Sequence, residues 1–356
     1  MIRVRQGRVL AVKEEHPDIQ FLRVSCDDQE ADAINYPALT GPARPDDIVT
    51  LNTTAVELGL GTGGQHFVMA IQGQARRLSG IGHIIKARYM PSQVRVQAVE
   101  EPGSAAHSVM ASPCHLNDMP VAVATLHSLI TPFAATFKQL TNARLAYIMT
   151  DGAALPAAFS KILRTLKTKG FIDAVITCGH AFGGDWEAVT PYSAMQAAQE
   201  VARCRACIVA MGPGVVGTQT PLGTTALEQA PLLDGAAALG ARAVAIPRIS
   251  FADTRTRHYG VSQHTLIALG RLAQVPTTVV LPFLPQDQKE LVLTQLHAAG
   301  VVPKHRLAWE HGDDIAALLE AAALQVTSMG RTPHDDPAFF AAAAAAGRYV
   351  ARLSRN

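Results

Sequence analysis

The sequence ACIVAMGPGVVGT, residues 206–218, shows how the surrounding chain is built. Its first six residues are apolar without interruption, which is typical of a strand buried on both faces of a sheet. Three glycines follow, and the segment 224–239 then has the periodicity of a helix. A buried strand, a glycine-rich loop and a helix form one step of an α/β fold.

The same alternation continues over most of the chain. We predict strands at 143–149, 172–177, 206–211, 243–246 and 277–281. We predict helices at 126–140, 159–169, 193–203, 224–239, 264–272 and 286–299, with an alanine-rich closing helix over Pro337–Leu353. Apolar strands that alternate with amphipathic helices predict a doubly wound parallel sheet of Rossmann-like type.

The first hundred residues follow a different pattern. Short β-type runs lie at 9–13, 20–25, 48–51, 66–71 and 94–99. Such strands, without a long helix between them, predict a small all-β barrel or sandwich. We therefore expect a β-barrel-like domain over 1–105, a linker over 106–120 and the Rossmann-like domain over 121–356.

Composition narrows the classes of partner. The chain carries 31 basic and 29 acidic residues, and this near-neutral balance argues against a nucleic-acid partner. No window of about 18 apolar residues exists, so we expect no membrane span. The charged start of the chain does not resemble a signal peptide, and five cysteines form no disulfide framework. We therefore expect a cytoplasmic protein.

Polar residues gather in the loops that follow the predicted strands. Right-handed crossovers place all of these loops at the carboxyl edge of a parallel sheet, where doubly wound folds bind ligands. One loop combines Gly212, Gly214 and Gly217 with Thr218 and Thr220. Glycine permits close approach of backbone N–H groups to an anion, and the threonines add hydroxyl donors. We expect this loop to bind a phosphate or a carboxylate.

Two other interpretations of the glycine loop stay open. The spacing also fits the dinucleotide fingerprint, although the next strand ends in Pro247-Arg248 where an acidic residue usually binds the ribose. Arg248 would then meet the 2′-phosphate of NADP. The glycines can also serve only to form a turn.

Acidic and imidazole side chains follow the first two predicted strands. Asp151 comes after one of them, and His180, Asp185 and Glu187 come after the next. These groups suit acid–base catalysis, and carboxylates with imidazole also suit a metal ion. The alternative is a polar loop that caps the helix beginning near Thr190. The sequence leaves the metal and any cofactor undetermined.

The loop after residue 246 is long and basic. Arg255, His258 and His264 can bind an anion, because guanidinium groups pair with phosphate or carboxylate and His258 can also transfer protons. In the N-terminal domain, His83 and Lys86 follow a glycine cluster and are further candidates for contact with an anionic ligand. Solvated surface charge and barrel corners are the alternatives.

Several of these motifs together resemble an uncharacterised bacterial family. The resemblance rests on Asn52-Thr53-Thr54 with Gly61-Thr62-Gly63-Gly64, Gly179-His180 with Gly183-Gly184-Asp185, Gly212-Pro213-Gly214 with Gly217-Thr218, and Asp253 through His264. That family is known only as a domain of unknown function of about this length. It implies no activity, substrate or catalytic residue.

The sequence favours an enzyme of unknown specificity, a hydrolase or a transferase. It would bind a phosphorylated or carboxylated small molecule, such as a nucleotide or sugar derivative, at the carboxyl edge. A non-catalytic metabolite sensor or scaffold is the first alternative, and an NADP-dependent oxidoreductase is the second. The alanine-rich closing helix is compatible with a homo-oligomer.

Overall fold

The computed structural model describes residues 1–61, 63–75 and 80–355. Thr62, within the glycine motif at 61–64, lies outside the described residues. The chain forms two compact units, Met1–Val96 and Gln97–Asn356.

The first unit is a closed five-stranded barrel in the order β1-β2-β3-β5-β4, as predicted by its short alternating strands. Leu22, Val24 and Leu51 are fully buried inside it. β3 pairs in parallel with β5, whereas the other barrel pairs are antiparallel. A small hairpin, β6–β7, follows the barrel. The elements are β1 Val4–His16, β2 Ile19–Cys26, β3 Gln29–Asn35, α1 Pro37–Thr40, β4 Ile48–Asn52, α2 Thr54–Glu57, β5 Gln65–Ile71, β6 Ile84–Lys86 and β7 Val94–Val96.

The second unit contains an eight-stranded, all-parallel sheet in the order β11-β10-β9-β12-β8-β13-β16-β17. The central strands are apolar and buried along their whole length, because helices cover both faces. This confirms the predicted Rossmann-like α/β architecture. The strands are β8 Pro120–Ala124, β9 Leu145–Thr150, β10 Ala174–Thr177, β11 Trp186–Glu187, β12 Ala206–Met211, β13 Arg242–Ile246, β16 Thr278–Pro282 and β17 Arg306–Glu310.

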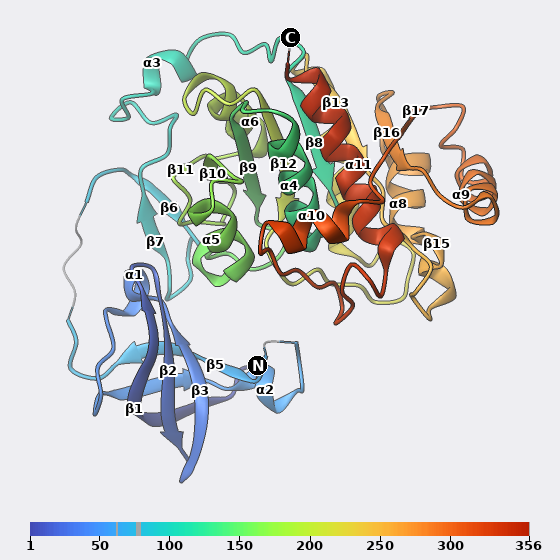
Figure 1. Cartoon of the computed structure of the whole chain (residues 1–356). Coiled ribbons are helices and arrows are strands. Elements are labelled where there is room, and N and C mark those ends of the chain that lie inside the picture. Colours follow the sequence, from blue (N-terminus) through green and yellow to red (C-terminus); the bar gives the residue numbers. More distant parts are fainter. Residues whose placement is uncertain (62, 76–79, 356) are drawn as a thin grey trace. The chain divides into compact units, whose positions relative to one another are not determined.

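Two hydrophobic cores form, one on each face of this sheet. Helices α4, α5, α10 and α11 supply one core, and α3, α6, α7 and α9 supply the other. Figure 1 shows α4, α10 and α11 together over one face of the sheet. The helices are α3 His107–Met110, α4 Ile130–Leu140, α5 Lys161–Thr168, α6 Pro191–Glu200, α7 Gln229–Ala238, α8 Gln263–Ile267, α9 Gln286–Ala298, α10 Ile315–Ala321 and α11 Pro337–Leu353. Between β13 and α8 the chain forms a short antiparallel ribbon of β14 Ile249–Ser250 and β15 Gly260–Val261.

The chain leaves the central strands in opposite directions. β8 leads to α4 on one face of the sheet. Its neighbour β12 leads instead to α7 on the other face. A crevice for a ligand is expected outside the carboxyl ends of strands at such a point. The short strand β8 was not predicted, because it directly follows the segment, rich in turn residues, that was expected to be the linker.

None of the helices in the described ranges is both long enough and apolar enough to cross a bilayer.

The alanine-rich helix α11 is buried inside the unit. Ala342 through Ala346 have no exposed surface, and the helix packs closely on α4. At Gly347 an added Cβ would lie 2.4 Å from the carbonyl oxygen of Phe133 on α4. Small side chains therefore set how near the two helices approach each other.

Replacing Gly347 by alanine should destabilise the unit although alanine is the better helix former. The added methyl group must push α4 and α11 apart, and overpacking of this kind costs about 1–3 kcal/mol. Urea denaturation followed by tryptophan fluorescence measures the effect, because both tryptophans, Trp186 and Trp309, lie in this unit. Gly103→Ala is the control, since its Cβ would meet only Gln97 Nε2 at 4.0 Å. Unchanged or increased stability of Gly347→Ala would contradict the packing argument.

Candidate functional site

The loops that follow the strands of the α/β unit touch one another in series. His180 N donates to Asp151 Oδ2 at 2.8 Å, which joins the loops after β10 and β9. Ala154 N donates to the oxygen of Pro213 at 3.1 Å, which joins the loops after β9 and β12. At Gly217 an added Cβ would lie 3.5 Å from His264 Cε1 on α8. Residues from all four loops therefore meet along one edge of the sheet.

A buried ionic cluster forms after β13. Asp253, which is 4% exposed, accepts hydrogen bonds from Arg255 Nε at 2.9 Å and Arg255 Nη2 at 2.7 Å. Arg248 Nη2 donates to the same carboxylate at 2.9 Å, and Arg331 Nη2 lies 3.5 Å from it. The bonds from Arg255, together with the nearby charge of Arg248, hold the pKa of Asp253 well below its usual range.

The cluster continues to the segment that precedes α11. Asp336 Oδ2 accepts from Ser250 Oγ at 2.6 Å and from Arg331 Nε at 3.0 Å. Three guanidinium groups, of Arg248, Arg255 and Arg331, thus face two carboxylates. One positive charge remains without a counter-charge within the cluster. Sequence analysis did not identify Arg331 or Asp336, because nothing in their local sequence connects them with residues 248–264.

Several buried polar atoms at this edge lack a hydrogen-bond partner within the described structure. Thr125 Oγ1 comes just after β8, and Arg248 Nε just after β13. Gln229 donates from Nε2 to the oxygens of Val123 at 2.8 Å and Ile246 at 3.0 Å, but its Oε1 accepts nothing. Such buried atoms are costly in a folded protein, so the three at this edge support it as a candidate ligand site.

Two neutral histidines adjoin the cationic cluster. The rings of His258 and His264 meet edge to face with centroids 4.9 Å apart, and His258 Nδ1 lies 2.8 Å from Ser262 Oγ. Burial, followed by the positive charges of Arg248 and Arg255, lowers the pKa of His258 to about 3. Burial and nearby arginines, Arg248 foremost, lower the pKa of His264 to about 4. Both imidazoles are therefore uncharged at neutral pH.

The glycine loop after β12 folds back on itself. Thr218 Oγ1 lies 2.9 Å from Thr220 Oγ1 and donates to the oxygen of Gly223 at 3.0 Å. The N–H of Thr218 also donates to Gly223, at 2.9 Å. The two hydroxyl groups therefore stabilise the loop itself.

Two positions of this loop require glycine, each for a different structural reason. At Gly212 an added Cβ would lie 2.7 Å from the oxygen of Ala154, so the loop after β12 needs glycine to approach the loop after β9. Gly214 has φ +112°, a conformation that side chains rarely adopt. These positions therefore bring neighbouring loops together.

A carboxyl group that sequence analysis missed lies at the start of α7. Thr150 Oγ1 is 2.8 Å from Glu228 Oε1 and 3.0 Å from Glu228 Oε2. Burial raises the pKa of Glu228 to about 7; the charge of Asp151 adds to this, whereas the bonds from Thr150 and the Met211 backbone oppose it. The available signal was its position in the first turn of the helix that follows the glycine loop.

Asp151 has a well-defined position beside this group. Besides the bond from His180 N, its carboxylate lies over Gly179, where an added Cβ would meet Oδ2 at 2.3 Å. Gly179 has φ +63°, so glycine serves both the turn and the approach of the carboxylate. His180 contributes its backbone N–H to Asp151 and is half-buried.

Asp185 and Glu187 are bound to neighbouring structure. Asp185 Oδ2 pairs with Lys167 of α5 and accepts from Val175 N at 2.8 Å. Glu187 accepts from Thr177 Oγ1 and Gly183 N, both at 2.7 Å. These bonds attach the loop and β11 to β10. The structure thus does not bring these two acids to the glycine loop.

His83 and Lys86 belong to the first unit. His83 is exposed, and Lys86 is buried within β6. The candidate site is therefore assembled here from the second unit alone.

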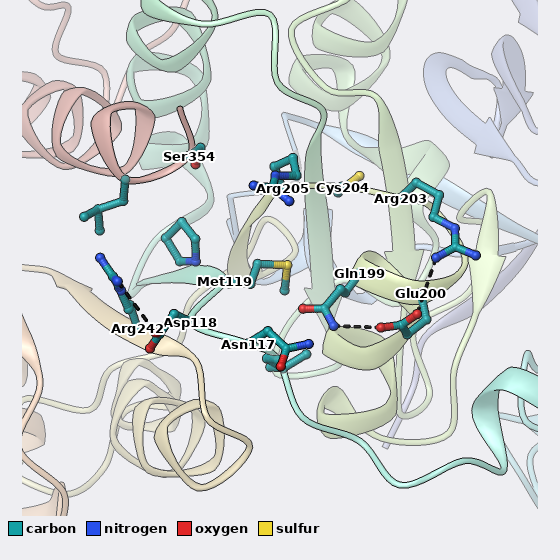
Figure 2. Close-up of a pocket in the computed structure, with 13 residues that line it drawn as sticks. Asn117, Asp118, Met119, Gln199, Glu200, Arg203, Cys204, Arg205, Arg242 and Ser354 are labelled. Atoms are coloured by element: carbon teal, nitrogen blue, oxygen red, sulfur yellow. Dashed lines mark hydrogen bonds and ion pairs between the residues drawn. The ribbon is translucent and has the colours of Figure 1, made fainter. Parts of the chain in front are cut away.

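A separate cavity of 540 Å³ lies at the opposite, amino edge of the sheet. Figure 2 shows Arg242 beside Asp118 on one side of it, and Glu200 between Gln199 and Arg203 on the other. These ion pairs are largely exposed, at 3.6 Å for Arg242–Asp118 and 3.4 Å for Arg203–Glu200. Exposed pairs of this kind contribute little energy. Substitutions at this edge are therefore suitable controls for substitutions at the carboxyl edge.

The described ranges contain no group of three or more histidine, cysteine, aspartate or glutamate side chains arranged to hold a metal ion.

Comparison with known protein families finds a match. The model of a family described as "Protein of unknown function (DUF3866)" matches residues 32–347. The search of curated proteins found no match.

Because His258 and His264 are neutral in the folded chain, we expect the free energy of unfolding to fall in mild acid. Below about pH 6.5 the unfolded chain protonates His258 and His264, whereas the folded chain does so only near pH 3 and pH 4. The unfolded state therefore binds more protons, and each histidine should lower the free energy of unfolding by about 2 kcal/mol between pH 7.5 and pH 5. Urea denaturation at several pH values measures this loss.

Replacing His264 by glutamine should remove the part of the acid-induced loss in the free energy of unfolding that comes from this histidine. The exposed His334→Gln is the matched control and should keep the full dependence. Equal loss of stability by His264→Gln and the wild-type chain between pH 7.5 and pH 5 would contradict a neutral His264 in the folded state.

Proposed function

Since this chain belongs to the DUF3866 family, which brings no assigned activity, we propose from its geometry that it is an enzyme for a phosphorylated or carboxylated small molecule. The ligand is a nucleotide or sugar derivative, or a compound of similar chemistry. Its anionic group binds Arg248, Arg255 and Arg331 at the carboxyl edge of the sheet. The observation that carries this proposal is the unbalanced positive charge of a buried cluster.

Charge supports an anion as the ligand. Three arginines against two carboxylates leave one unit of positive charge, and Arg257 adds a further charge near His264. Burial lowers the pKa of Arg248 to about 10, so it remains charged at neutral pH. An anion would compensate this charge in a region where charge interactions are strong.

Hydrogen-bonding chemistry supports phosphate or carboxylate in particular. Guanidinium groups bind both in a bidentate manner, and Arg248 Nε is a buried donor without a partner in the described structure. His258 and His264, being neutral, each offer one donor and one acceptor. This set suits the oxygen atoms of an anion together with neighbouring hydroxyl groups.

The expected role of the glycine loop changes in this proposal. Thr218 and Thr220 stabilise the loop, and Gly217 lies beside His264. The loop then forms one wall of the site, and the arginines hold the anion. Arg248, which would meet the 2′-phosphate in the NADP interpretation, belongs to the same cluster as Arg255 and Arg331, so these charges would suit that phosphate as well.

A non-catalytic sensor or scaffold is the second candidate. Asp185 and Glu187, expected to transfer protons, are instead bound to β10 and α5. A sensor needs only the cationic cluster and the histidines. Either function would fit a bacterial cytoplasmic protein with a small anionic partner, which the near-neutral charge also favours over nucleic acid.

Anion binding can be tested by thermal unfolding in the presence of inorganic phosphate, pyrophosphate, nucleotides and sugar phosphates. Ligand at 100 times its Kd stabilises the folded state by about 2.7 kcal/mol, so a bound anion should raise Tm clearly. Arg255→Ala removes the excess charge and should reduce the shift, while Arg255→Lys should keep part of it.

Arg242→Ala is the matched control, because this arginine lies in an exposed pair at the amino edge. It should leave the anion-dependent shift unchanged. Absence of a shift with all of these anions, or an equal loss in Arg242→Ala and Arg255→Ala, would count against the proposal.

A further inference from the structure

We infer that Glu228 and Asp151 are the acid and the base of a hydrolytic reaction at this site. Glu228 gives a proton to the leaving oxygen of the anionic ligand, and Asp151 takes one from the attacking water. This inference rests on the proposed function, and it favours the enzyme over the sensor. It replaces Asp185 and Glu187, which are bound elsewhere, with a carboxyl group that sequence analysis did not select.

The orientation of Glu228 is fixed from two sides. The hydroxyl group of Thr150, at the carboxyl end of β9, lies within 3.0 Å of both carboxyl oxygens. Gly152 lies on another side, where an added Cβ would be 2.9 Å from Oε2. A side chain at residue 152 would therefore displace the carboxyl group.

The elements around Glu228 favour its protonated form. Asp151 follows β9 and contributes a like charge, and Tyr147 within β9 is a further titratable neighbour. The backbone hydrogen bond of Met211 in β12 and the bonds from Thr150 oppose this effect, and α8, which packs on the turn 225–228, carries the neutral His264. Burial is the largest effect and holds the pKa of Glu228 at about 7.

The two carboxyl groups have different environments. Glu228 is largely removed from water, whereas Asp151 is exposed and has one oxygen fixed by the N–H of His180. Carboxyl pairs in contrasting surroundings divide the roles of acid and base in enzymes. Glu228 also belongs to the turn that packs on α8, and α8 presents His264 to the glycine loop and the cationic cluster.

The reaction balances with water as the only co-reactant. An O–H bond of water breaks and its proton moves to Asp151, while the water oxygen bonds to the phosphorus or carbonyl carbon of the ligand. The bond from that atom to the leaving oxygen breaks, and this oxygen takes the proton of Glu228. Solvent then returns a proton from Asp151 to Glu228.

The first experiment titrates the carboxyl groups of the full chain by ¹³C NMR with labelled glutamate, using Glu228→Gln to assign the resonance. Glu228 should titrate near pH 7, and Asp151→Asn should lower this midpoint because a like charge is removed. Saturating inorganic phosphate should raise the midpoint, since an adjacent anion disfavours the carboxylate. Equivalently, phosphate should bind at least about fivefold more weakly above this pH than below it, and Glu228→Gln should abolish the difference.

Glu200→Gln, beside the amino-edge cavity, is the control and should change neither phosphate binding nor the Glu228 midpoint. Titration of Glu228 in the ordinary range of glutamate would overturn the inference. So would phosphate that binds without moving the midpoint, because Glu228 would then lie outside the site. Failure of phosphate to bind at all would overturn the proposed function and this assignment with it.

The second experiment measures hydrolysis of phenyl phosphate and diphenyl phosphate against pH, because their leaving oxygens need a proton. The rate should fall above pH 7 as Glu228 loses its proton, and Glu228→Gln should lower it about 100-fold or more. Wild-type rates in Glu228→Gln, or no hydrolysis of either compound, would overturn the hydrolytic assignment. Phosphate binding measured on the same preparations separates this failure from failure of the proposed function.

Discussion

Parallel pairing of β8 with β12 and β13 is the constraint on which the rest of the structure depends. Because all strands of the sheet run in the same direction, every loop that follows a strand emerges at one edge. Gln229 reinforces this arrangement by bonding to the ends of β8 and β13 together. The hydrogen bonds of His180 with Asp151 and of Ala154 with Pro213, and the approach of His264 to Gly217, are consequences of that shared edge.

The sequence predicted the architecture well because buried strands and amphipathic helices are local patterns. The alternation from β9 to α9, apart from the two-residue strands β11, β14 and β15, could be read from hydrophobic periodicity, and the closing helix α11 from its alanine content. β8 was missed because its five small residues follow a segment rich in turn residues. The closed order of the barrel was beyond prediction, since strand pairing such as β3 with β5 is set by tertiary contacts.

For the candidate site, the sequence predicted the edge of the sheet at which it lies but not which side chains meet there. Residue type selected Asp185 and Glu187, yet backbone N–H groups and a lysine close to them in the fold bind their carboxylates. Arg331 enters the cluster from a distant segment, and no spacing in the sequence reveals that contact. Glu228 lay within a predicted helix, where a glutamate in the first turn normally suggests only a favourable interaction with the helix dipole.

The ionic cluster around Asp253 is a poor device for stability alone. Burying a guanidinium group costs several kcal/mol unless it is fully paired, and the buried Arg248 shares two carboxylates with the partly exposed Arg255 and Arg331. Two buried histidines stay neutral beside that charge, and Arg248 Nε and Asp336 Oδ1 keep no partner in the described structure. A cluster selected only to join the loop after β13 to the segment before α11 would have balanced charges and satisfied polar atoms. The excess positive charge and the unpaired donor Arg248 Nε are what the anionic ligand of our proposal would complete, whereas Asp336 Oδ1 would need a donor from the same ligand.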